Sequence, residues 1–338
     1  MSSVQPKHLV VLAITAIIYT YLISIIGYGH DYCVHYYAAK LFWQGQSPYG
    51  MAANTFLAHT CDAVSDGAGS AYPIPFLIII APMTWLPFIT SAILWTLSGT
   101  LLLLLAWLLV AESPKLITLI VLFLPCYQVI SIGQSTLHWF GLSVVLIFSI
   151  QRRWWFVAGC CMALLIWKPQ AGLIFALAGC WWAWRRERRA LVVMLCITFV
   201  FLIWAFMLFP NWIDEWLKQI RNYSNIVPLR SYALFVPVLV FTCWNLPWWT
   251  KVAAVQALLF PVGNPYMVLP LLLIWLSVGG WTALIGASLS YFWPVLPYSI
   301  HWYSILAPIC LVTAYHSWIL PRLRGGPTPP GNRRPLLD

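Results

Sequence analysis

The sequence predicts an all-α integral membrane protein with roughly 10–13 transmembrane helices and a long first extracytoplasmic loop. Of its 338 residues, 62% are hydrophobic and only 8% are charged, whereas a soluble domain carries about 25% charged residues. Many of its 22 Trp residues lie near the ends of apolar runs, where membrane proteins place interfacial aromatic belts. The net charge of +10 is explained by Lys and Arg retained on the cytoplasmic side. This composition excludes a soluble enzyme, a disordered chain and a nucleic-acid-binding module.

The predicted spans are long apolar runs, because a helix needs about 20 apolar residues to cross the hydrocarbon core. The first run follows Lys7 and lacks a cleavage site of the Ala-x-Ala type, so we interpret it as a retained span rather than a signal peptide. The second run is too long for one straight helix. Pro82 and Pro87 interrupt it, and we expect 73–86 to form an interfacial or dipping segment that leads into a helix over 88–111. The runs are, in order, 9–28, 73–111, 116–132, 135–150, 154–168, 170–184, 190–210, 231–247, 252–263, 266–278, 281–297 and 301–320.

The distribution of charge sets the predicted orientation. With the N-terminus inside, 13 of the 18 Lys and Arg residues fall on the cytoplasmic side, as the positive-inside rule requires. Residues 1–320 then form one membrane domain, and a basic, Pro/Gly-rich tail at 321–338 returns to the cytoplasm. Reading 73–111 as a two-span hairpin would move the arginines of 152–153 and 185–189 outside, so we reject it. Five of the eight carboxylates lie outside, and we expect any chemistry on that face of the plasma membrane.

The first outer loop, 29–72, begins with a predicted helix over 31–44. Aromatic residues recur there at helical spacing, and we expect this face to lie flat on the membrane. Its members are Tyr32, Tyr36, Ala39 and Trp43. The later part of the loop, 52–71, is rich in Gly, Ser and Asp and is expected to be mobile.

Asp31 follows the first span directly and allows two interpretations. It is either a solvated residue at a helix end or a general base close enough to the bilayer to meet a lipid-borne substrate. The neighbouring His30 is a candidate for substrate binding, whereas His35 is assigned no role, since surface histidines beside aromatic residues are common. Cys33 and Cys61 share this loop, and a disulfide between them can form if the loop faces an oxidising space; the sequence leaves open whether they are bonded.

Two turns between short apolar runs carry further candidates, and both point outward in the predicted topology. Lys168 is the only charged residue between Arg153 and Arg185. A charge at such depth indicates function by default, and a phosphate is a suitable partner; the alternative is a lysine that snorkels to the interface. Gln134, in the other turn, either donates to a sugar or phosphate or caps a helix end.

The segment 211–230 forms a second outer element with an amphipathic pattern. Trp212, Trp216 and Ile220 mark its apolar side, and most such faces are simply solvated. Arg221 and Arg230 are secondary candidates for binding an anionic headgroup.

Several familiar motifs are missing from the sequence. It contains no Walker loop, no dinucleotide-binding glycine loop, no HExxH and no GxSxG. Its nine Cys residues show no spacing that suggests zinc. Nucleotide-dependent and hydrolytic chemistry therefore have no support, and no cofactor is expected. A role for a divalent metal is left open.

The order of these pieces resembles glycosyltransferase family 87, a family of polyprenol-phosphate-sugar-dependent enzymes in the GT-C superfamily. The matching stretches are 31–49, 72–75 with Pro82 and Pro87, 92–95, 133–134, 168–169 and, more weakly, 263–266. Tyr72 lies in the second of these stretches and joins the candidates for substrate binding. The resemblance covers about residues 8–275.

The resemblance implies a polytopic helical fold with an extracytoplasmic active site. The donor would be a sugar, commonly mannose, carried on a polyprenyl phosphate, and the acceptor a glycolipid or glycan among the membrane lipids. Transfer would invert the anomeric centre, and the family's acidic residue in the first outer loop, which acts as base, maps onto Asp31. Lys168 would then offset the charge on the departing phosphate.

Two alternatives stay open at the level of the sequence. A transporter or flippase of lipid-linked sugars would share the outer polar cavity and the cation, although we find no internal repeat of the kind that many transporters show. A catalytically inactive assembly subunit would keep the fold and lose the activity. The presence of both Asp31 and Lys168 argues against the second.

Overall fold

A computed structural model describes residues 30–61, 70–110, 119, 122–226, 232–260, 265–296 and 302–320. Every regular element within these ranges is a helix, which confirms the all-α fold class. The predicted first span and the C-terminal tail lie outside the described residues.

Helix α2 (His30–Trp43) opens the first outer loop and confirms the helix predicted there. Its aromatic face, however, is not spread on a membrane surface. Tyr32 and Tyr36 are 0% and 3% exposed, and the ring of Tyr32 packs against Phe88 and Trp95 of a later helix. For these residues the prediction was wrong, because helical spacing marks an apolar face without telling whether lipid or protein covers it. Trp43, at the end of the same face, is 44% exposed.

Helix α3 (Gly50–Cys61) occupies the start of the stretch that we expected to be mobile. Ala53, Leu57 and Cys61 recur every four residues and are buried, which gives the helix an apolar face to pack. A disulfide joins Cys61 to Cys33 of α2, with Cα atoms 5.7 Å apart. The pairing considered from the sequence is therefore present. Most of the rest of that stretch lies outside the described residues.

The long second apolar run is interrupted as predicted. Helix α4 (Ile74–Ile80) continues into the 3-10 helix η1 (Ala81–Trp85), and α5 (Phe88–Val110) begins after a break. Pro82 lies at the start of η1, and Pro87 lies in the break directly before α5. At both positions the proline ring and its missing N–H prevent a continuous α-helix.

The middle of the chain forms a group of closely packed helices. They are α7 (Leu124–Ser131), α8 (Thr136–Arg152), α9 (Trp155–Leu165), α10 (Pro169–Arg186) and α11 (Arg188–Leu208). Glycine permits the close approach: a Cβ at Gly159 would lie 2.7 Å from the carbonyl oxygen of Ala190, and one at Gly172 would lie 2.7 Å from that of Leu165. Small residues at helix contacts are typical of membrane proteins.

Two of the described helices are long and apolar enough to cross a membrane, namely α5 over Phe88–Leu105 and α11 over Arg188–Leu208. Only 6% of the α11 window is buried within the protein, and large side chains such as Phe199 and Met207 are exposed along it. This face is suited to lipid rather than water. The total number of spans and the orientation of the chain remain predictions.

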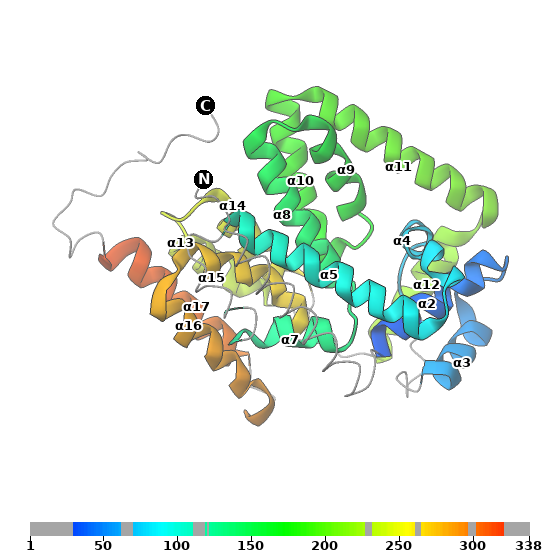
Figure 1. Cartoon of the computed structure of the whole chain (residues 1–338), viewed down its shortest axis with the longest axis horizontal. Helices are drawn as coiled ribbons and strands as arrows, with labels where there is room; N and C mark the ends of the chain where they lie inside the picture. Colours follow the sequence, from blue (N-terminus) through cyan, green and yellow to red (C-terminus); the bar gives the residue numbers. More distant parts are fainter. Residues whose placement is uncertain are drawn as a thin grey trace.

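The amphipathic helix predicted in 211–230 is confirmed as α12 (Trp212–Ile226), with Trp212 buried and Trp216 partly buried. The remaining helices follow it. They are η3 (Ala233–Phe235), α13 (Val236–Thr242), α14 (Trp248–Leu259), η4 (Pro265–Leu271), α15 (Leu272–Val278), α16 (Gly280–Ser288), η5 (Leu289–Val295), α17 (Tyr303–Ala314) and the π-helical η6 (Tyr315–Ile319). Figure 1 shows α2, α3 and α12 at one end of the long axis, away from α16 and α17.

Candidate active site

The turn between α7 and α8 is held against the start of α2. Gly133 adopts a φ of +63° there, and a Cβ at this position would lie 2.8 Å from the Cβ of Tyr32. The Tyr32 N–H donates to the carbonyl of Ile132 at 3.3 Å, and the Trp95 indole donates to the carbonyl of Gly133 at 3.1 Å. Only glycine satisfies both the positive φ and this close approach. The turn therefore places Gln134 beside Asp31, which lies in the first turn of α2.

The turn between α9 and α10 brings Lys168 to the same place. Pro169 begins α10 directly after it, as proline does at the first position of a helix. Lys168 is fully buried and its Nζ donates to Gln134 Oε1 at 2.6 Å and to Ser135 Oγ at 2.7 Å. The ammonium also lies 5.4 Å from the ring centroid of Tyr72, within reach of a cation–π interaction.

Gln134 links the carboxylate to the ammonium. Its Nε2 donates to Asp31 Oδ2 at 2.5 Å, while its Oε1 accepts from Lys168. A carboxylate only accepts and an ammonium only donates, so the amide has one orientation in which both bonds form. The neutral amide keeps Asp31 and Lys168 at a fixed separation on two sides of one small site.

His35 and Ser135 complete the cluster. The Ser135 hydroxyl lies 3.2 Å from His35 Nε2 and 3.0 Å from Gln134 Oε1. Burial lowers the pKa of His35 well below its ordinary value, and the nearby Lys168 lowers it further. The imidazole is therefore neutral in this site. Its ring meets the edge of Tyr72 at a centroid distance of 4.4 Å.

Two tyrosines from the later part of the chain, Tyr223 and Tyr266, lie near the cluster. Burial raises the pKa of Tyr72, and so do Tyr266 of η4 and Asp31. Burial and the Asp31 carboxylate also raise the pKa of Tyr223 on α12. The tyrosine hydroxyls remain protonated, and Tyr72 donates to Gln134 Oε1 at 3.5 Å. Asp31 itself is partly exposed, so a substrate can reach it.

Four of the residues singled out in the sequence meet in this cluster: Asp31, Tyr72, Gln134 and Lys168. Arg221 lies on α12 with an exposed side chain, and its role in headgroup binding stays a prediction. Arg230 and the side chain of His30 lie outside the part of the chain that is described.

The sequence interpretation missed His35, Ser135 and Tyr223. Two signals were present. His35 lies four residues after Asp31, on the same face of a helix, and Ser135 adjoins Gln134. Tyr223 gave no signal, because its approach to Asp31 depends on where α12 packs. Among the described residues no group of three or more His, Cys, Asp or Glu side chains could hold a metal ion.

Comparison with known proteins agrees with the class of protein that the sequence indicates. The family model of glycosyltransferase family 87 matches residues 71–293, which include Tyr72, Gln134 and Lys168. No match is found among curated proteins or among solved structures.

The protein is therefore a glycosyltransferase. It belongs to glycosyltransferase family 87, as the resemblance in its motifs predicted. Asp31 and His35 precede the matched residues, so their roles depend on the geometry described above.

Proposed function

We propose that this glycosyltransferase moves a hexosyl group, with mannose as the first candidate, from a polyprenyl-phosphate sugar to a hydroxyl of a lipid or glycan acceptor. The observation that carries the proposal is the chain of two hydrogen bonds that joins Asp31, Gln134 and Lys168. It joins a carboxylate to a lysine through one amide, in a cluster that is built from three separate parts of the chain, and so supports a site with a base and a cation.

Asp31 acts as the general base. Its carboxylate takes the proton of the acceptor hydroxyl while the hydroxyl oxygen attacks the anomeric carbon of the donor. The bond between that carbon and the phosphate oxygen breaks, and polyprenyl phosphate leaves from the opposite face. The anomeric centre is therefore inverted in a single step. The partial exposure of Asp31 supports this role, because the acceptor must reach the carboxylate.

Lys168 stabilises the departing phosphate. Negative charge develops on the phosphate oxygens as the bond breaks. Its attraction to a cation is stronger in a water-excluded site than in bulk solvent, and Lys168 is fully buried. Its hydrogen bonds to Gln134 and Ser135 go to neutral acceptors, so a phosphate would not compete with a carboxylate bonded directly to this lysine. Such a carboxylate would cancel the charge of the ammonium.

The lipid-linked donor requires a membrane setting, which the apolar helices α5 and α11 support. We place the protein in the plasma membrane as a multi-pass chain with both termini in the cytoplasm and the Asp31 site on the outer side. Membership of a glycosyltransferase family favours transfer over the transport alternative. An inactive assembly subunit would show no transfer in the wild type.

The test is transfer of label from radiolabelled polyprenyl-phosphate-mannose in membranes that contain the wild type or Asp31→Asn. Loss of a general base lowers a rate by about 10²–10⁴-fold, and we expect a loss in this range at unchanged expression. Asp66→Asn, at another carboxylate of the same predicted loop, is the matched control and should retain activity. Equal transfer by the wild type and Asp31→Asn would remove Asp31 from the mechanism.

A further inference from the structure

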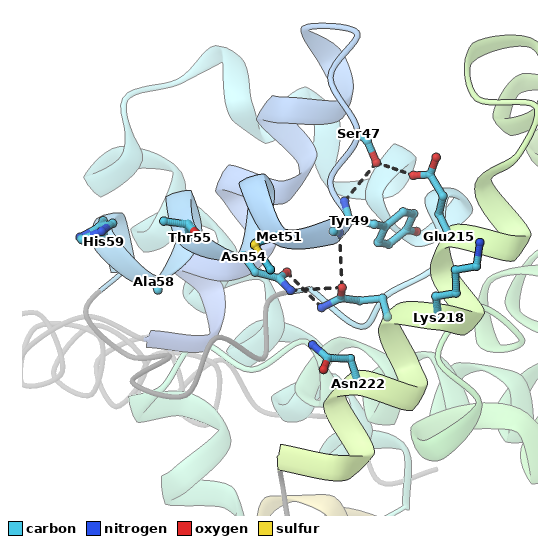
Figure 2. Close-up of a pocket in the computed structure, with 12 residues that line it drawn as sticks. Ser47, Tyr49, Met51, Asn54, Thr55, Ala58, His59, Glu215, Lys218 and Asn222 are labelled. Carbon is cyan, nitrogen blue, oxygen red and sulfur yellow. Dashed lines mark hydrogen bonds between the residues drawn. The ribbon is translucent and has the colours of Figure 1, made fainter.

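A groove lies between α3 and α12, apart from the buried cluster. It has a volume of about 880 Å³, within the range of roughly 300–1,000 Å³ that small-molecule sites occupy. The lining residues come from the end of the α2–α3 turn and from facing sides of the two helices (Figure 2). They are Ser47, Tyr49, Gly50, Met51, Asn54, Thr55, Ala58, His59, Glu215, Lys218, Gln219 and Asn222.

The two walls of the groove are fastened to each other by side-chain amides. Asn54 Nδ2 donates to Gln219 Oε1 at 3.3 Å, and Gln219 Nε2 donates back to Asn54 Oδ1 at 3.1 Å. Both side chains are buried, with exposures of 8% and 3%, and they form the floor. This pair uses one of the two N–H groups of Asn54. The groove is therefore preformed, with amide groups at its base.

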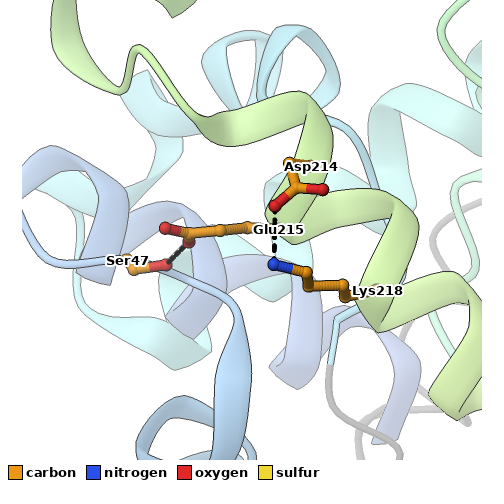
Figure 3. Close-up of polar contacts among 4 residues, drawn as sticks. All are labelled: Ser47, Asp214, Glu215 and Lys218. Atoms are coloured by element: carbon orange, nitrogen blue, oxygen red, sulfur yellow. Dashed lines mark hydrogen bonds and ion pairs between the residues drawn. The ribbon is translucent and has the colours of Figure 1, made fainter.

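The charged side chains of the groove already have polar partners (Figure 3). The Ser47 hydroxyl donates to Glu215 Oε2 at 2.6 Å, and Lys218 pairs with Asp214 at 2.6 Å. The lining contributes one carboxylate and one ammonium, each of which already has a partner. The Glu215 carboxylate is bonded to a neutral hydroxyl and keeps its negative charge, so this surface disfavours an anionic ligand.

Amides, hydroxyls and the imidazole of His59 provide the rest of the polar lining. Asn54, Asn222 and Thr55 offer both donors and acceptors, which suit a ligand rich in hydroxyl groups. The side chains of Met51 and Ala58 add apolar surface, against which the C–H faces of a sugar ring can pack. The combination fits a neutral carbohydrate.

Both walls lead toward Asp31. On α3, Ala58 and His59 lie next to Cys61, whose disulfide to Cys33 fixes this end of the helix beside the first turn of α2. On α12, Asn222 precedes Tyr223, the tyrosine whose pKa burial and the Asp31 carboxylate raise. The two walls converge independently on the same carboxylate.

We propose that the α3–α12 groove binds a neutral glycan portion of the acceptor and directs its hydroxyl end to Asp31. This inference rests on the proposed transfer reaction. It names the acceptor as a neutral, hydroxyl-rich carbohydrate whose chain runs along the groove, with the reacting hydroxyl at the disulfide end.

The test measures binding rather than catalysis. Saturation-transfer NMR on the full chain in nanodiscs would compare three neutral probes, α-1,6-mannotriose, maltotriose and chitotriose, with the acidic probe trigalacturonate. Thr55→Trp places a bulky ring in the groove at an exposed position of α3. Thr60→Trp makes the same change at an exposed position of α3 that does not line the groove, and serves as the matched control.

We expect at least one neutral probe to bind the wild type, Thr60→Trp and Asp31→Asn alike, and trigalacturonate to bind none of them. Thr55→Trp should weaken that binding by about tenfold or more, or 1.4 kcal/mol. Absence of binding by every neutral probe, preference for the acidic probe, or equal binding by Thr55→Trp and Thr60→Trp would overturn the inference. Asp31→Asn retains the groove, so binding and transfer are tested separately. Glycan binding by a wild type that shows no transfer activity would refute the proposed reaction and leave the glycan site standing.

Discussion

Replacing Lys168 with Met is expected to abolish transfer while leaving the protein as stable as the wild type, or more stable. Methionine keeps an unbranched side chain of similar length and removes only the ammonium. In the wild type this ammonium is fully buried and donates to two neutral acceptors, Gln134 and Ser135. After the change, the Ser135 hydroxyl still lies 3.0 Å from Gln134 Oε1, so both partners keep a hydrogen bond.

The expected magnitudes follow from this environment. Burying one ion costs several kcal/mol, and two hydrogen bonds to a charged group return about 1.5–3 kcal/mol each. These contributions nearly cancel, so the change in unfolding free energy should lie near zero or favour the variant. Catalysis has no such compensation. Removing one preorganised stabiliser of transition-state charge costs about 2.7–4 kcal/mol, or 10²–10³ in rate.

The assay combines thermal unfolding followed by Trp fluorescence with the radiolabelled transfer reaction on the same preparations. Lys251→Met is the matched control, because Lys251 is a partly buried lysine on α14 that donates to the carbonyl of Leu246 at 2.8 Å. We expect Lys168→Met to keep its Tm within about 4 °C of the wild type and to lose transfer, while Lys251→Met keeps transfer. A large fall in Tm that accounts for the lost activity, or full activity in Lys168→Met, would refute this reasoning.

Two further predictions concern the supports of the site. Gly133→Ala should lower both Tm and transfer, because its Cβ would lie 2.8 Å from the Cβ of Tyr32. Gly45→Ala is the control, since Gly45 has a φ of +75° and nothing within 4 Å. It should lower the unfolding free energy only by the left-handed backbone penalty of about 1–2 kcal/mol. Equal losses of Tm in these two variants would contradict the close contact. The double variant Cys33→Ser/Cys61→Ser should lose roughly 3–4 kcal/mol of stability, as expected for closing a loop of 28 residues. Adding reductant should lower the Tm of the wild type but not that of the variant, and a wild type that does not respond to reductant would contradict the prediction.

Local patterns in the sequence were sufficient for much of the fold. The break at Pro82 and Pro87 was predicted because proline interrupts a helix wherever it occurs. The helix α12 was predicted because its Trp residues recur at helical spacing. Both inferences use only residues that are neighbours along the chain, and the structure confirms them.

The sequence predictions were wrong where they had to state whether lipid, water or protein covers a helix face. Tyr32 and Tyr36 form an aromatic face, but its pattern is the same whether lipid or another helix covers it. The structure shows protein contacts there, with Phe88 and Trp95 of α5. His35 was given no role for the same reason, since only its burial against Tyr72 and Ser135 distinguishes it from a surface histidine.

The sequence by itself determined the helical class and the family, and it singled out a carboxylate, an amide and a lysine as candidates, because residue type and local spacing carry that information. Only the tertiary structure decided that they meet. Asp31 and Gln134 are 103 residues apart, and Gln134 and Lys168 are 34 apart. Contacts over such separations depend on how whole helices pack, which no local pattern specifies. The groove between α3 and α12 has the same origin, since its two walls come from segments that are about 165 residues apart along the chain and meet only when those helices pack together.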